Sequence, residues 1–294
     1  MAKVKTFKTI FPAVSVPLND DYSINEPEFR AYLRWIKTFY GKGMDGLVCN
    51  GHTGEITGLT RAERKRVVEI CAEECGDVMT IISGVNCENT AESIEMAKEA
   101  KEAGADGILL MPPHMWLRFG MNPDAPFEYV KDVAEGADID IIIHLYPATS
   151  KAFYPVETLI KMCKEIDHVK CIKMGTRVTS IYEHDVRLLR QECPDISLIT
   201  CHDETLCVSW FPGMDGALIG FAGCVPEIIC PAREVFANPD KHTLKEAQDW
   251  SDRIYHISQA IYGGGQPSGE AHARLKEALK QRGIFSSALM RKPV

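Results

Sequence analysis

The chain has 294 residues, with 33 Lys and Arg against 41 Asp and Glu, so its formal net charge at pH 7 is −8. Its composition, 45% hydrophobic and 25% charged, is that of a globular protein and excludes disordered, collagen-like and low-complexity chains. The acidic balance lacks the clustered Lys and Arg that binding to nucleic acid or to a membrane surface needs, so we expect neither as a partner.

The eleven Cys are too few and too irregularly spaced, in a chain of this length, to indicate a disulfide scaffold. No Cys-x-x-Cys pair occurs, and Cys171 and Cys230 lie among apolar residues, which predicts reduced thiols in the core. The first residues contain no long apolar run, and no segment approaches 18 apolar residues. We therefore predict a soluble cytoplasmic protein.

Short apolar runs rich in Val and Ile recur along the chain and read as strands. They begin near Phe11, Asp45, Met79, Asp106, Asp140, Val169, Ile196 and Asp215. Because these runs are continuously apolar rather than alternating, they predict parallel strands that are buried on both faces.

After the apolar runs come segments in which apolar residues recur every three or four positions, the spacing of a helix. Asn25 precedes an apolar stripe at spacings of three and four that extends to Tyr40, and Thr60 with Glu63 forms a capping-box pattern. Pro155 is expected in the first turn of another helix. Eight strands that are each followed by a helical segment predict a (β/α)8 TIM barrel, with an open doubly wound sheet as the alternative.

About 70 residues follow the eighth strand and read as helices over 226–237, 243–261 and 269–282. This is more than one closing helix needs. We predict a barrel catalytic domain over 1–225 and a C-terminal helical region over 226–294 that packs on it, since no Pro- or Ser-rich linker separates the two.

In such barrels the active site lies at the carboxyl ends of the strands. The second strand ends in the segment 50–55, where Gly51 and Gly54 bracket Thr53. This arrangement lets backbone N–H groups approach a small anion, and the Thr53 hydroxyl adds a donor. A carboxylate would fit there, although an ordinary turn is the alternative.

The fifth strand ends in His144, Leu145, Tyr146 and Pro147. His144 and Tyr146 are two residues apart and share one face of the strand, so either is a candidate for proton transfer. The alternative is that both are packing residues. Together with His52, His114 and His202, His144 also raises the question of a metal site. These histidines lack the short spacings of metal motifs, so we predict none.

The sixth strand carries Lys173, which shares a face with Cys171, whereas Lys170 takes the other face. Burial of a lysine ammonium lowers its pKa from about 10.4, and a neutral amine is what attack on a carbonyl requires. The alternative is a lysine that reaches solvent or pairs with a carboxylate.

With the turn after the second strand, the end of the fifth strand and Lys173 taken together, the sequence resembles the dihydrodipicolinate synthase and N-acetylneuraminate lyase superfamily of class I aldolases. The resemblance extends over nearly the whole chain. The residues that carry the resemblance are Gly51-His52-Thr53-Gly54-Glu55, Leu59-Thr60, Glu63-Arg64, Tyr146-Pro147, Pro155 and Ile172-Lys173. The resemblance implies that Lys173 forms a Schiff base, that Thr53 and neighbouring amides hold the carboxylate of a 2-keto acid, and that a strand-five tyrosine shuttles protons. It also implies a homotetramer or homodimer.

The departures from the family pattern concern the substrate. His52 replaces a Thr or Ser, and His114-Met115 replaces a tyrosine pair. An ungapped match on Pro147 puts His144 at the position of the catalytic tyrosine, so His144 remains a rival to Tyr146. The arginine that holds the second substrate's carboxylate in the synthases is replaced by Thr149, and Met174 replaces a glutamate. Lysine biosynthesis is therefore disfavoured.

We predict a cofactor-independent, metal-free lyase of the aldolase type that acts on pyruvate or a longer 2-keto acid. The catalytic candidates are Lys173, Tyr146 and His144; the substrate-binding candidates are Thr53, His52, Gly54 and Leu218. The alternatives are a dehydratase of 2-keto-3-deoxy sugar acids that uses the same imine, a non-catalytic binding or regulatory relative, and a metal-dependent lyase.

Overall fold

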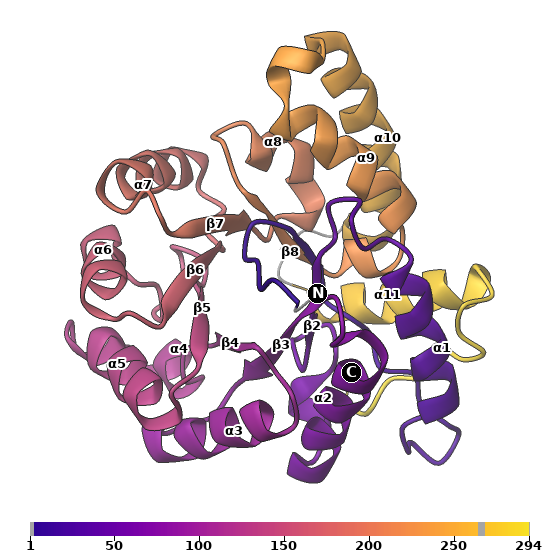
Figure 1. Cartoon of the computed structure of the whole chain (residues 1–294), viewed down its shortest axis with the longest axis horizontal. Helices are drawn as coiled ribbons and strands as arrows, with labels where there is room; N and C mark the ends of the chain where they lie inside the picture. Colours follow the sequence, from indigo (N-terminus) through magenta and orange to yellow (C-terminus); the bar gives the residue numbers. More distant parts are fainter. Residues whose placement is uncertain (1–2, 264–267, 294) are drawn as a thin grey trace.

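Eight parallel strands form the centre of the molecule (Figure 1). A computed structural model describes residues 3–263 and 268–293. Its strands are β1 (Ile10–Pro12), β2 (Gly46–Cys49), β3 (Thr80–Val85), β4 (Gly107–Leu110), β5 (Asp140–His144), β6 (Val169–Met174), β7 (Ser197–Thr200) and β8 (Gly216–Ile219). From β2 to β8 each strand pairs with the next in sequence, and β1 pairs with β8. An isolated bridge from Ala13, directly after β1, to Val48 of β2 closes the ring. The predicted (β/α)8 barrel is confirmed.

Helices surround this ring of strands (Figure 1). They are α1 (Glu26–Lys37), α2 (Arg61–Cys75), α3 (Thr90–Glu102), α4 (Met115–Phe119), α5 (Ala125–Ala137), α6 (Val156–Glu165), α7 (Thr179–Glu192), α8 (Leu206–Trp210), α9 (Pro226–Ala237), α10 (Leu244–Tyr262) and α11 (Gly269–Gln281). The connections between described elements contain the short 3₁₀ helices η1 (Ile56–Gly58), η2 (Asp203–Thr205), η3 (Phe221–Gly223) and η4 (Pro239–Lys241).

The caps predicted for α1 and α2 are present, and the structure differs from the prediction at two helix ends. Asn25 caps α1 through Glu28 N, and Thr60 and Glu63 form the predicted capping box of α2. The stripe of α1 ends earlier than expected, because the helix stops at Lys37 and leaves Tyr40 45% exposed. Pro155 stands one residue before α6, with the extended backbone of an N-cap rather than as the first helical residue.

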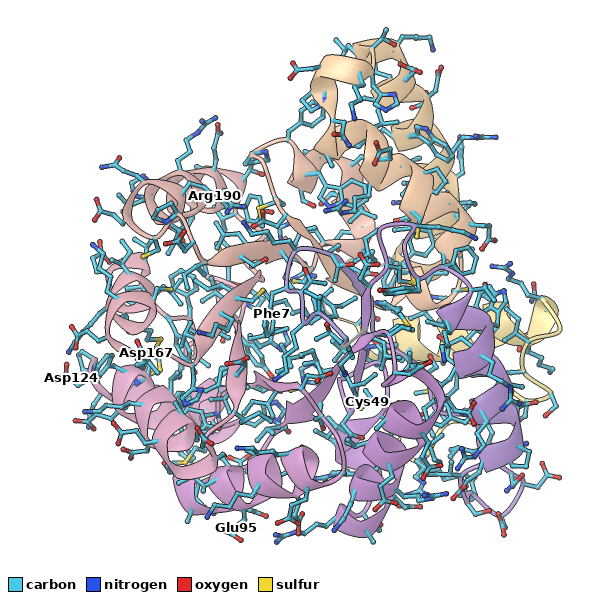
Figure 2. The ribbon with its side chains drawn as sticks, viewed as in Figure 1. Phe7, Cys49, Glu95, Asp124, Asp167 and Arg190 are labelled. Carbon is cyan, nitrogen blue, oxygen red and sulfur yellow. The ribbon has the colours of Figure 1, made fainter. Side chains whose placement is uncertain are left out.

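The barrel interior is apolar and sealed. Phe11, Val48, Ile82, Leu109, Met111, Ile142, Cys171, Ile199 and Leu218 point inward from the strands and form one buried cluster with Ala13. Phe7, which precedes β1, packs against this cluster near the centre of the ring (Figure 2). The interior is therefore filled at the amino ends of the strands, so a cavity along the barrel axis has room only at the opposite end.

The helices α9, α10 and α11 follow β8. The helix α10 packs against both α8 and α9, and α11 packs against α10 (Figure 1). The predicted helical region includes residues 264–267, which lie outside the described residues. The boundary at 225/226 stays a prediction.

The eleven Cys are free thiols, and ten of them are buried, as the sequence pattern indicates. In the described part of the chain, no helix combines the length and apolar character that crossing a membrane requires.

A buried ion pair joins α11 to the segment that follows β2. The Lys276 ammonium contacts the Glu55 carboxylate, and these side chains are 1% and 7% exposed. Lys276 Nζ also donates to Leu289 O at 2.7 Å, and Glu55 Oε2 accepts from Arg291 N at 2.9 Å. Glu55 holds a left-handed backbone at φ 57°. The helix α11 and residues 289–291 are therefore held by these contacts against the turn at the mouth of the barrel.

We expect Lys276→Met to lower the free energy of unfolding by about 3–5 kcal/mol, because it leaves the Glu55 carboxylate buried without a counter-charge. Chemical denaturation followed by circular dichroism measures the loss. The matched control is the double variant Glu55→Gln with Lys276→Met, which removes both charges and is expected to recover most of the stability. A single variant as stable as the wild-type protein would contradict the importance of this pair.

Candidate active site

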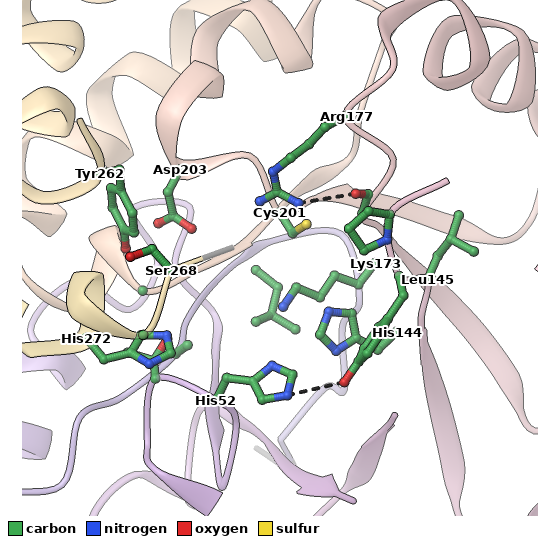
Figure 3. A pocket seen from close by; sticks show the side chains of 18 of the residues that line it. His52, His144, Leu145, Lys173, Arg177, Cys201, Asp203, Tyr262, Ser268 and His272 are labelled. Atoms are coloured by element: carbon green, nitrogen blue, oxygen red, sulfur yellow. Dashed lines mark hydrogen bonds between the residues drawn. The ribbon is translucent and has the colours of Figure 1, made fainter. Parts of the chain in front are cut away.

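A cavity of about 400 Å³ opens at the carboxyl ends of the strands (Figure 3). The carboxyl ends of β1, β2, β4, β5, β6, β7 and β8, or the loops after them, contribute to it, as do α10 and α11. Of the predicted site residues, its lining contains Lys173, Tyr146, His144, Thr53, His52 and Leu218. Residues from seven strands, or from the loops that follow them, therefore meet in one space although they are far apart in sequence, as the barrel topology requires.

Lys173 is the one lysine of the described residues that line this cavity, and its side chain enters the space beside His144 and Cys201 (Figure 3). Within residues 3–263 and 268–293 its ammonium has no ion-pair or hydrogen-bond partner. Burial lowers the pKa of Lys173, and Arg177 lowers it further, whereas Cys201 and Asp203 oppose the shift. Lys170, by contrast, is exposed and donates to Asp167 O. The geometry thus favours a half-buried, unpaired amine that faces the cavity over an ammonium that reaches solvent or is paired.

His144 and Tyr146 approach Lys173 from the neighbouring strand. His144 is the direct register partner of Lys173, so the two side chains enter the cavity at the same level. The rings of His144 and Tyr146 meet edge to face, with centroids 4.9 Å apart. Both candidates for proton transfer therefore lie in the cavity.

The Tyr146 hydroxyl stands between two imidazoles. It lies 2.9 Å from His114 Nε2 and 3.2 Å from His52 Nε2. His114 Nε2 also lies 3.3 Å from the Asn86 side-chain nitrogen, which only donates, so His114 Nε2 acts as the acceptor. Tyr146 then donates to His114 and accepts from His52. This is a continuous path for a proton across the cavity.

His52, which belongs to this path, and His144, which lies beside it, carry no charge at neutral pH. Burial, with a smaller effect of Lys173, lowers the pKa of His52 to about 3, and burial also lowers the pKa of His144 well below its ordinary value. Burial raises the pKa of Tyr146, so its hydroxyl stays protonated. Neutral histidines both donate and accept protons, which a relay requires.

The turn after β2 brings His52 and Thr53 to the cavity, but not Gly54. The Gly54 amide donates to Gly51 O at 3.1 Å within the turn, and Gly54 is missing from the described residues that line the space. Thr53 Oγ1 instead faces Gly220, where an added Cβ would lie 3.0 Å from it. The hydroxyl of Thr53 is therefore the available donor on this side of the cavity.

The sequence analysis does not single out five of the described lining residues with titratable side chains: Arg177, Cys201, Asp203, Tyr262 and His272. Asp203 follows β7, so its place after a strand was a usable signal. Burial raises its pKa to about 6. Tyr262 and His272 come from α10 and α11, and their distance in sequence from the strands hides them. Burial, with Lys173, lowers the pKa of His272 to about 4.

The four histidines considered for a metal do not act together. His202 lies outside this cavity and packs on Tyr182, with ring centroids 4.8 Å apart. His52, His114 and His144 do meet, at centroid distances of 5.6–6.0 Å from His52. Among the described residues, however, no three His, Cys, Asp or Glu side chains are arranged to hold a metal ion.

The chain matches one protein family over nearly its whole length. The model of the "Dihydrodipicolinate synthetase family" covers residues 6–294. An uncharacterized DapA-like lyase from Pyrococcus horikoshii is 30% identical over 97% of this chain and 93% of its own length. A 4-hydroxy-tetrahydrodipicolinate synthase from Bartonella bacilliformis is 26% identical over 92% of this chain and 87% of its own length.

The fold has a matching solved structure as well. A prophage protein of the dihydrodipicolinic acid synthase family from E. coli, crystallised with pyruvate, superposes with a TM-score of 0.87. The match covers 99% of this chain and 93% of the other, at 20% sequence identity. At that identity the likeness supports the fold alone.

The burial of Lys173 predicts an amine that reacts at lower pH than an ordinary lysine. A lowered pKa means that the neutral fraction reaches one half at a pH below 10.5, so the rate of reductive methylation of Lys173 should rise with pH and level off early. Peptide mass spectrometry measures this rate. The same protein unfolded in urea is the control. A midpoint at or above that of the unfolded chain would contradict the prediction.

Proposed function

The chain belongs to the dihydrodipicolinate synthetase family, whose members are lyases, and on this premise we propose that it is a Schiff-base-forming lyase of the aldolase type. Its substrate is pyruvate or a longer 2-keto acid. The observation that carries the proposal is the Lys173 side chain, which enters the cavity with a lowered pKa and without a partner among the described residues.

Binding places the 2-keto acid between the second and sixth strands. The Thr53 hydroxyl and the His52 ring hold the carboxylate and the adjacent oxygen, since both line the cavity on the side of β2. The ketone carbon then faces Lys173. Holding the two groups in this orientation removes much of the entropic cost of their reaction.

The Lys173 nitrogen attacks the ketone carbon, a C–N bond forms, and the former carbonyl oxygen leaves as water after it gains two protons. The product is a protonated imine. This cation draws electrons from the next carbon, which loses a proton or a C–C bond to give an enamine. The enamine supports cleavage in one direction and, in the other, attack on an aldehyde.

Each step needs a proton delivered to or removed from an oxygen or a carbon beside Lys173. We assign this task first to Tyr146, because its hydroxyl is hydrogen-bonded to His114 and His52 and can exchange protons with both rings. His144 is the rival, since it is the register partner of Lys173. It enters the same cavity with a neutral ring.

Borohydride reduction in the presence of pyruvate tests the Schiff base. A stable adduct is expected on Lys173, because hydride reduces the imine to a secondary amine, and peptide mass spectrometry locates it. Lys173→Ala should abolish both the adduct and turnover of a panel of 2-keto acids and aldehydes. Lys170→Ala, which removes an exposed lysine of the same strand, is the matched control and should change neither. An unmodified Lys173 would refute the proposal.

Variants of the two candidate shuttles separate their roles. Tyr146→Phe should leave the pyruvate adduct in place and lower the exchange of the pyruvate methyl protons with D2O by about 10²–10⁴-fold, the typical contribution of acid–base catalysis. His144→Gln should lower this exchange less. NMR follows the exchange, and adduct formation confirms an intact site. The opposite ranking would make His144 the shuttle.

A further inference from the structure

Besides Lys173, the cavity holds a guanidinium that the proposed imine chemistry leaves unused. Among the described residues that line it, Arg177 is the only arginine, and it follows β6 four residues after Lys173. Its side chain is 23% exposed, and Figure 3 shows it on the far side of the cavity from His52. Arginine is permanently charged, and its placement in a partly buried space needs an explanation.

The partners of Arg177 hold the guanidinium but do not saturate it. Nε donates to Glu204 Oε1 at 2.6 Å, and Nη1 donates to Gly175 O at 3.3 Å. Within the described residues, Nη2 has no hydrogen-bond partner, and it is not sealed from accessible space. Glu204 thus orients the group by one edge and leaves N–H donors free for a planar anion.

The topology places this cation opposite the predicted carboxylate site. In a closed ring of eight strands, β2 and β6 are four strands apart and face each other across the mouth. Thr53 follows β2, Arg177 follows β6, and Lys173 reaches into the space between them. A chain molecule that places one end at Thr53 and its ketone at Lys173 can direct its other end to Arg177.

The carboxylate of Asp203, which also lines the cavity, lies on a different side of it from Arg177. Asp203 stands beside Tyr262, and Cys201 separates it from Arg177 (Figure 3). Asp203 Oδ1 accepts from Phe221 N at 2.9 Å, which fixes the carboxylate toward η3. An anion bound at Arg177 therefore avoids direct contact with the Asp203 carboxylate.

We propose, on the basis of the proposed function, that the substrate is a 2-keto acid with a second carboxylate at its far end, and that Arg177 binds this carboxylate. In the condensation direction the corresponding partner of pyruvate is an aldehyde that carries a carboxylate. Pyruvate has six non-hydrogen atoms, and a cavity of about 400 Å³ leaves space beyond it for such a chain. Arg177 is then a specificity-determining residue for this site.

The test compares 2-keto diacids of four to six carbons with their distal amides in borohydride capture on Lys173. The amide keeps the size and removes the charge. A charge-assisted hydrogen bond of about 1.5–3 kcal/mol corresponds to a factor of about 10–100, so wild-type protein should capture at least one diacid half-maximally at a concentration lower by that factor. Peptide mass spectrometry measures the extent of capture.

Substitution of Arg177 should remove the preference selectively. Arg177→Gln is expected to capture diacid and amide at similar concentrations, and Arg177→Lys should retain part of the preference. Because Arg177 also lowers the pKa of Lys173, the readout is the ratio of the diacid and amide concentrations within each variant, which a general change in the reactivity of Lys173 leaves unaltered. Arg187→Gln is the matched control, because Arg187 is an exposed arginine of α7 that pairs with Glu183 outside this cavity. It should behave as wild type.

The outcomes separate the two proposals. If wild-type protein captures pyruvate but shows no preference for any diacid over its amide, the role of Arg177 is refuted and the Schiff-base function stands. The same holds if Arg177→Gln keeps the preference. If Lys173 captures neither pyruvate nor any diacid, the proposed function falls and the inference falls with it.

Discussion

Strand parity in a closed parallel barrel is the constraint on which the rest of this molecule depends. Every second residue of a strand points inward, so the interior position of Cys171 fixes that of Lys173 two residues later. The same parity, through the register of β5 with β6, places His144 at the level of Lys173. A shift of β6 by one residue would put Lys170 and the strand's other outward side chains into the core, so the fold and the amine are specified together.

The second determinant is the neutral state of the groups around Lys173. Among the described residues, four imidazoles, two phenols and the Lys173 amine line the cavity, and burial lowers the pKa of His52, His144 and Lys173 and so favours their neutral forms. Neutral groups are the ones that attack a carbonyl or relay a proton. The overall charge of −8 does not oppose anionic substrates here, because the local environment is set by Thr53, His52, Lys173 and Arg177.

Much of this was predictable from the sequence. Continuous apolar runs located all eight strands, and parity put Lys173 on the inner face. The turn at 51–55 was found from its glycines, but the internal bond of the Gly54 amide depends on turn geometry that composition does not reveal. The family resemblance was confirmed by the match over residues 6–294. Tyr262 and His272 stayed hidden because tertiary packing alone brings their helices to the mouth.

The attachment of α11 to the turn after β2 has a consequence for folding. Lys276 pairs with Glu55, and the hydrogen bond from Arg291 N to the same carboxylate spans 236 positions of the sequence. Contacts between residues so far apart carry a high cost in loop-closure entropy. Tyr262 and His272 line the same cavity from α10 and α11. The ligand cavity is therefore a product of non-local contacts and not of any single strand-helix unit.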